Sequence, residues 1–408
     1  MDVGGLAEAR VQAGALEGLR VLDVATMMAA PWTATYLGDY GADVVKVELP
    51  GRGDPVRDWG SQVDGTPLMW KGLARNKTLI TLALNRPEGQ RMLLDLVDQF
   101  DVLIENFRPG VMERWGLGPE ALHERHPGLI ILRTTAYGQT GPYSHKPGFG
   151  TLAEAFSGLS HMTGEPDGPP VLAGYPLADG VAALTGVMGV LSAVYWRDVR
   201  GGTGQVIDNA ISEANYRLID HVMLDYAVLG QVRTRAGNRL GDLAPRNTYR
   251  TRDGGWIAIS GGTQGIVESL FRAMGRPDLL DDARFATNAS RRRNVDALDE
   301  EIGAWMATLD VDTVMALFEE YGVAGTAVND AAQIAAHEHF RARELLQRVD
   351  DPDLGPVPTS HVHPRLSETP GGVEALGGAV GRDNAAFYAE ALGLDDDDLA
   401  RLGAAGVV

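Results

Sequence analysis

Short apolar runs alternate with amphipathic segments along the first part of the chain. The apolar runs have the length and composition of buried strands, and they lie at 19–25, 42–48, 78–84, 101–107 and 128–138. Two segments with helical spacing, 31–41 and 87–100, each begin with a proline. Strands that alternate with helices predict a parallel sheet with helices on both faces, so we expect an α/β fold.

The longest apolar stretch, 171–196, begins as a loop rich in glycine and proline and continues as a helix. We expect this helix to begin at or directly after Asp179. Aspartate is a favoured N-cap, and the helix dipole stabilises negative charge at that end. Asp179 is therefore either a structural cap or a carboxylate held at a helix start for chemistry, and the local pattern leaves both open. Because the helix is near the lower length limit for a membrane span, we interpret it as a buried core helix.

The pattern changes near residue 236. Segment 247–262 is typical of a hairpin with its turn at Asp253-Gly254, and amphipathic helices follow near 266–274, 295–307 and 311–321. These elements predict a smaller α+β domain at 236–330. A glycine-rich turn and a strand are expected near 201–210, and residues 206–235 are expected to form a connecting segment dominated by a second long helix. Residues 1–205 and 331–408 are expected to form the large domain.

Composition narrows the classes of function. The 408 residues favour two domains, and the net charge of −19 argues against a nucleic-acid partner. The absence of cysteine excludes disulfides and thiolate ligands. The histidine pairs at 337 and 339 and at 361 and 363 lack zinc spacing, so we expect no metal. The N-terminal segment has no long apolar run, which predicts a cytoplasmic protein.

Ligands of parallel sheets bind beyond the carboxyl ends of the strands, so the loops there are candidate sites. Segment 25–31, ATMMAAP, lacks the G-x-G-x-x-G pattern, so we exclude a dinucleotide and give Glu48 a structural role. Cationic residues cluster in and near these loops, and they are Arg52, Arg57, Arg75, Lys77, Arg108 and Arg114. A planar guanidinium suits phosphate capture, and this cluster predicts a local anion site in an acidic protein.

Several segments, taken in order, resemble the family III coenzyme A transferases, the group of formyl-CoA transferase and carnitine CoA-transferase. They include VLDVATMMAAPWTATYLGDYGADVVKVE, IENFRPGVMERWGLG, the LADG that contains Asp179, and GGTGQVIDNAI. The similarity covers about residues 16 to 370. It implies a Rossmann-like large domain built from both chain ends, a smaller α+β domain between them, and an interlocked, ring-like homodimer.

The resemblance also implies a mechanism, in which Asp179 attacks an acyl-CoA thioester and forms an acyl-aspartyl anhydride. The released thiolate then gives an aspartyl-CoA thioester, and an acceptor acid repeats the sequence in reverse. A carboxylate suits this exchange because it is matched in leaving ability to both acids. Backbone N–H groups near Gly180 are expected to stabilise the oxyanion. The expected partners are an acyl-CoA and a carboxylic acid, with no tightly bound cofactor, nucleic acid or membrane.

The resemblance assigns roles to residues of this chain that stand at the positions of the family's site residues. Asn106, Phe107 and Arg114 match CoA-contacting residues of the family, and Arg108 matches an arginine of some members. Thr26 and Met28 stand where formyl-CoA transferase has histidine and glutamine, a departure that argues against formyl or oxalyl substrates. The substrate side is expected to include Trp59, which matches a tryptophan of the site, Tyr137 at a strand end, and Gly241. Gly237 and Gly241 lie in 237–247, where the family has a glycine loop.

Two alternatives remain open. A 2-methylacyl-CoA racemase shares this fold and uses a G-H-D motif, which would fall at Gly148-Phe149-Gly150. Phe149 cannot exchange a proton, which disfavours this reading. The other alternative is a non-catalytic acyl-CoA-binding protein, which the retained Asp179 argues against.

Overall fold

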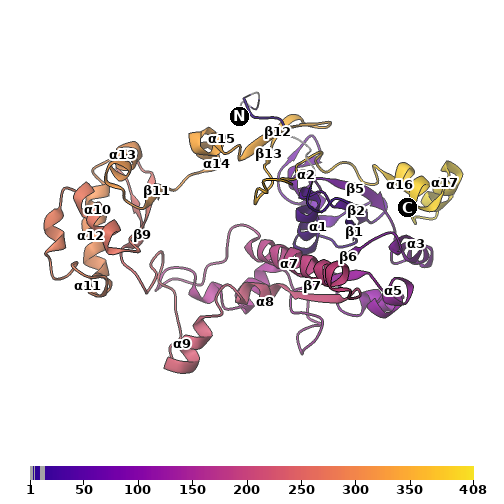
Figure 1. Ribbon diagram of the computed structural model, residues 1–408, viewed down its shortest axis with the longest axis horizontal. Coiled ribbons are helices and arrows are strands. Elements are labelled where there is room, and N and C mark those ends of the chain that lie inside the picture. Colours follow the sequence, from indigo (N-terminus) through magenta and orange to yellow (C-terminus); the bar gives the residue numbers. More distant parts are fainter. Residues whose placement is uncertain (1–2, 4, 10–13) are drawn as a thin grey trace. The chain divides into compact units, whose positions relative to one another are not determined.

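A six-stranded parallel sheet forms the centre of the first part of the structure, and it confirms the predicted α/β class (Figure 1). Its strands are β1 (Arg20–Asp23), β2 (Asp43–Glu48), β5 (Lys77–Thr81), β6 (Val102–Glu105), β7 (Ile130–Thr135) and β8 (Val206–Ala210). They lie in the order β5-β2-β1-β6-β7-β8. After β1, the chain adds β2 and then β5 on one side of it; β6, β7 and β8 are then added in turn on the other side. This is the doubly wound order, in which ligands bind where the winding reverses.

Both faces of this sheet are covered. Helices α1 (Ala29–Asp39) and α7 (Leu177–Arg200) lie on one face, and α3 (Pro87–Val97) and α5 (Pro119–Arg125) belong to the hydrophobic core of the other (Figure 1). Neighbouring residues of β1 show the alternation: Val21 packs in the core with α1 and α7, and Leu22 packs in the core with α3 and α5. The C-terminal helices α16 (Asn384–Leu392) and α17 (Asp396–Ala404) add to that second core.

Helix α7 begins earlier than the sequence predicts. Its first residue is Leu177, its N-cap is Pro176, and no side chain caps it. Hydrogen bonding starts early because the Gly180 N–H donates to the Pro176 carbonyl at 3.0 Å. Asp179 is thus the third residue of the helix, and the expectation that it caps the helix is wrong. Its carboxylate is left available for other contacts.

In the segment 206–235 the predicted strand is confirmed, but the single long connecting helix expected after it is wrong. Val206–Ala210 pairs in parallel with β7 as the sixth strand of the sheet, and two short helices follow, α8 (Ile211–Tyr216) and α9 (Val222–Leu229). The backbone groups of 206–210 are used by the ladder to β7, so a helix cannot start before Ile211.

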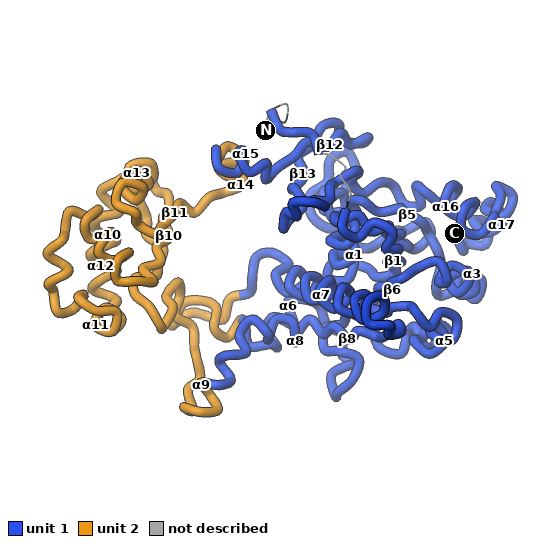
Figure 2. Tube along the Cα trace, in the orientation of Figure 1, with its two compact units in different colours: residues 1–159, 172–224, 338–408 blue, residues 160–171, 225–337 orange. Residues whose placement is uncertain are grey.

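The structure describes residues 3, 5–9 and 14–408, and the chain divides into two compact units (Figure 2). The first contains Met1–Leu159, Leu172–Leu224 and Glu338–Val408. The second contains Ser160–Val171 and Asp225–His337. These bounds differ from the expected ones in three places. The segment Ser160–Val171 belongs to the second unit although it precedes α7 in sequence, the expected connecting segment 206–235 is divided after Leu224, and the second unit extends to His337.

The second unit has its own core. Its antiparallel sheet contains β9 (Arg246–Arg250), β10 (Trp256–Ser260) and β11 (Gly325–Ala327), and the β9–β10 hairpin is as predicted, with Gly254 at a φ of 88° in the turn. Its helices are α10 (Gln264–Ala273), α11 (Asn288–Arg293), α12 (Val295–Met306) and α13 (Val311–Tyr321).

The remaining elements are short. They are η1 (Pro55–Asp58), β3 (Gln62–Val63), β4 (Thr66–Pro67), α2 (Leu68–Leu73), α4 (Val111–Arg114), α6 (Gly150–Phe156), η2 (Ser160–Met162), η3 (Pro277–Leu280), α14 (Ala331–Ala336), α15 (Glu338–Ala342), β12 (Leu346–Asp351) and β13 (Gly355–Ser360).

Candidate active site

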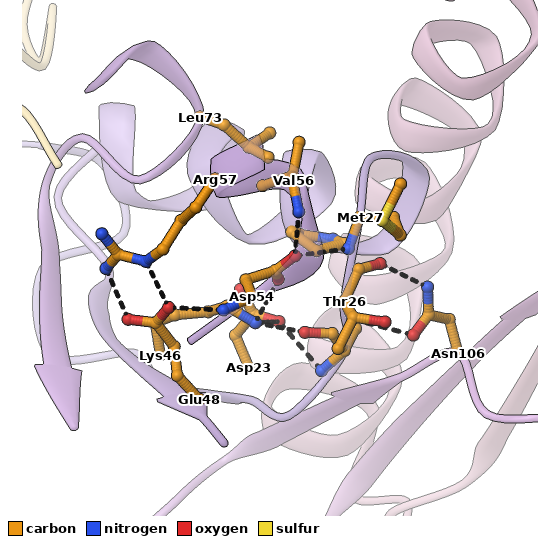
Figure 3. A network of polar contacts seen from close by, with 12 residues as sticks. Asp23, Thr26, Met27, Lys46, Glu48, Asp54, Val56, Arg57, Leu73 and Asn106 are labelled. Carbon is orange, nitrogen blue, oxygen red and sulfur yellow. Dashed lines mark hydrogen bonds and ion pairs between the residues drawn. The ribbon is translucent and has the colours of Figure 1, made fainter. Parts of the chain in front are cut away.

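The loops that follow β1 and β6 are joined where the sheet reverses direction. The Thr26 N–H donates to Asn106 Oδ1 at 2.9 Å, and Asn106 Nδ2 donates to the Thr26 carbonyl at 2.6 Å. Both polar atoms of the Asn106 side chain are therefore used to hold the β1 loop (Figure 3). Asn106, expected to contact CoA, is in this structure a clamp between two loops of the candidate site.

The β1 loop contains a strained residue. Met27 has a φ of 68°, in the left-handed region that side-chain-bearing residues rarely adopt. Such a conformation costs roughly 1–2 kcal/mol. The Met27 N–H donates to Asp54 Oδ1 at 3.0 Å, and the same oxygen accepts the Val56 N–H at 3.0 Å. Strain of this kind persists only where surrounding contacts hold it, and it is most frequent at functional sites.

A buried ionic cluster lies beneath this loop (Figure 3). Lys46 Nζ is 3.3 Å from Asp54 Oδ2 and 3.8 Å from Asp23 Oδ1, and it donates a hydrogen bond to the Ala25 carbonyl. Lys77 Nζ lies 3.0 Å from Asp23 Oδ2. Burial opposes the charge on Lys46, but the carboxylates of Asp23 and Asp54 outweigh it and raise its pKa. The cluster contains two positive and two negative side chains, so the buried charges are balanced.

Three of the cations expected to bind an anion are instead committed to buried carboxylates. Arg57 pairs with Glu48 at 2.7 Å, Arg75 with Asp39 at 2.6 Å, and Lys77 with Asp23. The structural role predicted for Glu48 is confirmed by this pairing. Arg108 and Arg114 are exposed, and within the part of the chain that the structure describes neither forms an ion pair with a carboxylate. They remain candidate phosphate ligands.

Two cavities of the first unit meet at Asp179. We call one the strand-end cavity; it measures about 210 Å³ and is lined by Thr26, Asn106, Arg108, Tyr137, Lys146 and neighbouring residues. We call the other the methionine cavity; it measures about 290 Å³ and is lined by Met27, Met28, Met69, Trp59, Glu154 and residues 173–179. Met27, Met28, Phe149 and Asp179 border both. The carboxylate thus lies at the boundary of one cavity of mixed lining, which includes two cations, and one of largely apolar lining.

The environment of Asp179 disfavours its charge. Burial raises the pKa of Asp179 to about 6, and among the described residues no cation is recorded as opposing this shift. The backbone of α6 approaches the carboxylate closely, because a Cβ at Gly150 would collide with Asp179 Oδ2. The φ of Gly150 is not in the left-handed region, so glycine provides space here: with any side chain at 150, the Asp179 carboxylate would have to move. A partly desolvated carboxylate bordering a cavity is a candidate reacting group.

The structure brings together most of the residues predicted for the site. Thr26, Met28, Asn106, Arg108 and Tyr137 line the strand-end cavity with Asp179, and Trp59 lines the methionine cavity. Three others lie elsewhere. Phe107 packs edge-on against Trp115, and Arg114 on α4 lines neither cavity. Gly241 belongs to the second unit, where it lines a separate cavity.

Of the backbone N–H groups near Gly180 that were expected to stabilise an oxyanion, that of Gly180 itself is bonded to the Pro176 carbonyl inside the helix. Lys146 and Met27 line the cavities but were not predicted as site residues, and Phe149, expected only at the position of a racemase motif, lines both cavities. Lys146 follows the predicted strand at 128–138 by eight residues, so its closeness to a strand end was a usable signal. No sequence pattern marks the conformation of Met27.

This combination of fold and site defines a class: an α/β enzyme that binds a small molecule at the reversal point of a parallel sheet. The sequence matches the profile of CoA-transferase family III over residues 16–384, so the chain belongs to this family, as the resemblance predicted. Its relatives are named CoA-transferases, and the chain is a transferase enzyme.

Two relatives and one solved structure show the extent of the similarity. The chain is 43% identical over 394 residues to succinyl-CoA–D-citramalate CoA-transferase of Chloroflexus aurantiacus, covering 96% of this chain and 98% of that protein. It is 36% identical over 348 residues to succinyl-CoA:mesaconate CoA-transferase of Haloarcula hispanica, covering 83% and 86%. The crystal structure of a CAIB/BAIF family protein from Brucella suis matches with a TM-score of 0.83 and 32% identity, covering 93% of this chain and all (100%) of that one.

The raised pKa of Asp179 predicts a stability cost at neutral pH. An unfolded aspartate titrates near 3.8 and the folded one near 6, so the folded state binds more protons between these values and loses stability as the pH rises through 6. Asp179→Asn removes the charge at nearly the same volume. We expect it to raise the free energy of unfolding by about 2–3 kcal/mol at pH 7.5, with the gain shrinking as the pH falls toward 4. Urea denaturation of both proteins at several pH values measures this; an equal gain at every pH would contradict it.

Proposed function

We propose that this enzyme transfers CoA from an acyl-CoA donor to a carboxylic acid, with Asp179 as the covalent nucleophile. The observation that carries the proposal is the position of the Asp179 carboxylate, partly desolvated and shared by two cavities of different character. Desolvation makes the carboxylate a stronger nucleophile than one in water, and its location gives a thioester room on one side and an acid on the other.

The two cavities suit the two parts of a thioester. Arg108 and Lys146 give the strand-end cavity positive charge, which favours the phosphates and the polar pantetheine arm of CoA. Arg114, outside this cavity, is assigned to the outer phosphates. The methionine cavity has thioether and indole walls and takes the acyl chain. The sulfur is then placed near Asp179, where the cavities meet.

The chemistry proceeds through two anhydrides. The Asp179 carboxylate attacks the thioester carbonyl, the C–S bond breaks, and an acyl-aspartyl anhydride and CoA thiolate result. The thiolate attacks the aspartyl carbonyl, which releases the donor acid as a carboxylate and leaves Asp179 as its CoA thioester. The acceptor carboxylate attacks this thioester, and the thiolate then attacks the acceptor carbonyl of the second anhydride. Retained CoA makes these later attacks effectively unimolecular.

The first turn of α1 is the source of oxyanion donors in this proposal. Met28 and Ala29 line the strand-end cavity together with Asp179. The first N–H groups of a helix have no partner within the helix, and the dipole favours negative charge there. Within the described residues, the Ala29 and Ala30 N–H groups make no other backbone hydrogen bond, and the thioester oxygen is placed against them.

The relatives suggest the substrates. Their names pair succinyl-CoA with D-citramalate or mesaconate, so we propose a succinyl-CoA-type donor and a short dicarboxylic acceptor. A panel tests this: succinyl-CoA or acetyl-CoA is incubated with citramalate, mesaconate, malate, glutarate and a monocarboxylate such as butyrate. Transfer with ping-pong kinetics supports the proposal, and the best acceptor identifies the acid.

A racemase of this fold is the alternative activity. The positions of its G-H-D motif hold Phe149, whose side chain is 61% exposed beside both cavities, and Gly150, which is packed against Asp179. Neither can move a proton. Incubation of a 2-methylacyl-CoA with the enzyme in deuterium oxide distinguishes the two activities. Incorporation of deuterium at C2 without CoA transfer would show a racemase and contradict the transferase proposal.

The nucleophile assignment predicts that Asp179→Ala loses CoA transfer by at least about 10⁴-fold, since the covalent path is removed. CoA binding, measured by calorimetry, should stay within a few-fold of the parent. Hydroxylamine should trap parent Asp179 as a hydroxamate only when acyl-CoA is present, which mass spectrometry of the peptide detects. Transfer by Asp179→Ala at near the parent rate would show that another group is the nucleophile.

The pKa of about 6 predicts the acid limb of the pH profile. The ionised carboxylate attacks and the protonated one does not, so kcat/KM should fall about tenfold per pH unit below pH 6 and be level above it. Initial rates between pH 4.8 and 8 at fixed ionic strength measure this. A profile that stays level down to pH 5 contradicts either the shift or the role.

We further propose a homodimer, of the interlocked kind that the family resemblance implies. The outer face of α7 carries large exposed apolar side chains at spacings of three and four residues, namely Leu184, Met188, Leu191, Tyr195 and Val199. Monomeric proteins seldom expose such a stripe. In the described part of the chain, α7 is also the one helix long and apolar enough to cross a membrane. Its inner face packs against α1 and the sheet, so we assign the outer face to a second copy of the chain.

Met188→Glu tests the dimer. Met188 is 65% exposed in the single chain, so a charge there costs little in a monomer but is buried without a partner in the dimer. We expect sedimentation at micromolar concentration to show a dimer for the parent and a large monomer fraction for the variant. Arg91→Glu, a charge change on the exposed surface of α3, is the control and should remain dimeric. A monomeric parent would contradict this part of the proposal.

A further inference from the structure

Three consecutive residues of the β1 loop are each held by a side chain from a different part of the first unit. Lys46 of β2 donates to the Ala25 carbonyl, Asn106 after β6 binds both backbone groups of Thr26, and Asp54 accepts the Met27 N–H (Figure 3). These residues lie between the end of β1 and the start of α1. Such a density of contacts to one short loop indicates that its conformation is specified, beyond what connecting two elements requires.

Asp54 is itself fixed from two sides. Its backbone N–H donates to Glu48 Oε2 at 2.8 Å, and Glu48 is held by Arg57 through two hydrogen bonds of 2.7 Å each. The Arg57 guanidinium lies 3.8 Å from the centre of the Trp70 ring. On the other side, the Asp54 Oδ2 atom faces Lys46 Nζ. The carboxylate that receives the Met27 N–H therefore has little freedom to move.

The two oxygens of Asp54 have separate tasks. Oδ1 accepts the Met27 and Val56 N–H groups, whereas Oδ2 faces Lys46 at 3.3 Å and forms no hydrogen bond within the described residues. A buried ion pair adds little stability over apolar packing, so stability alone is a weak reason for this arrangement. The hydrogen bond to the strained Met27 is a stronger reason for this arrangement, because Met27 borders both cavities at Asp179.

We infer that Asp54, supported by Lys46, is a positioning residue that holds Met27 in its left-handed conformation and thereby sets the wall where the two cavities meet. It touches no substrate and acts through Met27. The inference rests on the proposed function, in which the thioester must lie at this wall to meet Asp179. A displacement of about 1 Å in such a wall costs about 10²-fold in rate, because the reacting atoms must lie within near-attack distance.

The first test distinguishes the roles of the two carboxylate oxygens of Asp54. Asp54→Ala should lower kcat of CoA transfer by about 10²-fold with a smaller change in KM. Asp54→Asn keeps an acceptor for the Met27 N–H and loses the charge facing Lys46, so it should stay within about fivefold of the parent. The matched control is Asp39→Ala, which breaks a similarly buried ion pair, with Arg75, away from both cavities; it should lose stability and keep kcat within about threefold. If Asp54→Asn loses as much as Asp54→Ala, the ionic cluster and not the positioning of Met27 is responsible.

The second test uses glycine, which adopts positive φ without strain. In a Met27→Gly background the loop needs less support, so adding Asp54→Ala should cost less than about tenfold, against about 10²-fold in the parent background. Equal losses in both backgrounds overturn the inference, and this cycle decides it even if Asp54→Asn folds poorly. A parent enzyme without CoA transfer refutes the proposed function instead. In that case a crystal structure of Asp54→Ala decides the positioning step: φ of Met27 should become negative, and an unchanged loop overturns it.

Discussion

The pair of hydrogen bonds between Asn106 and Thr26 is the contact on which the rest of the site depends. Where the sheet reverses, the ladder between β1 and β6 ends with the hydrogen bond from the Val24 N–H to the Ile104 carbonyl. Beyond it, the side chain of Asn106 joins the two loops by pairing with both backbone groups of Thr26. Met27, which Asp54 holds, and the start of α1 come directly after this joined residue in the chain. Dinucleotide-binding proteins with a doubly wound fold have a glycine-rich turn after the first strand. In this chain the corresponding loop is held by the side chains of Asn106 and Lys46.

Ionic groups are placed beneath the candidate site, and the Asp179 carboxylate lies apart from them. Asp23, Asp54, Lys46 and Lys77 neutralise one another under the β1 loop, while Asp179 borders the cavities without a recorded cationic partner. Desolvation therefore governs the pKa of Asp179, and ion pairing governs that of Lys46. In this arrangement the structural cations do not pair with the carboxylate proposed as the nucleophile. It also explains why arginines near strand ends were poor predictors of ligand binding, since Arg57 and Arg75 belong to the support.

The elements of the fold could be predicted because their signals are local. The apolar runs that became β1, β2 and β6 and the hairpin at Asp253-Gly254 each follow from patterning within a few residues. The start of α7 could not be predicted from the sequence, because the helix begins at Leu177 without a capping side chain. Its first turn is closed by a backbone hydrogen bond to the Pro176 carbonyl. The strand at Val206–Ala210 was predicted, but its place beside β7 was not, because this pairing joins segments about 75 residues apart. Cavity-lining residues could be predicted where a family position marks them, as for Asp179, and could not where only packing selects them, as for Met27.

The glycine at 150 has a consequence for how this scaffold can be altered. The volume that a side chain would need at 150 is already occupied by the carboxylate at 179, so the two positions compete for one space. A side chain at 150 can therefore be accommodated only if the carboxylate at 179 moves away from α6. A substitution at 150 would then change the orientation of the group at 179, and the two positions are best altered together when this scaffold is redesigned.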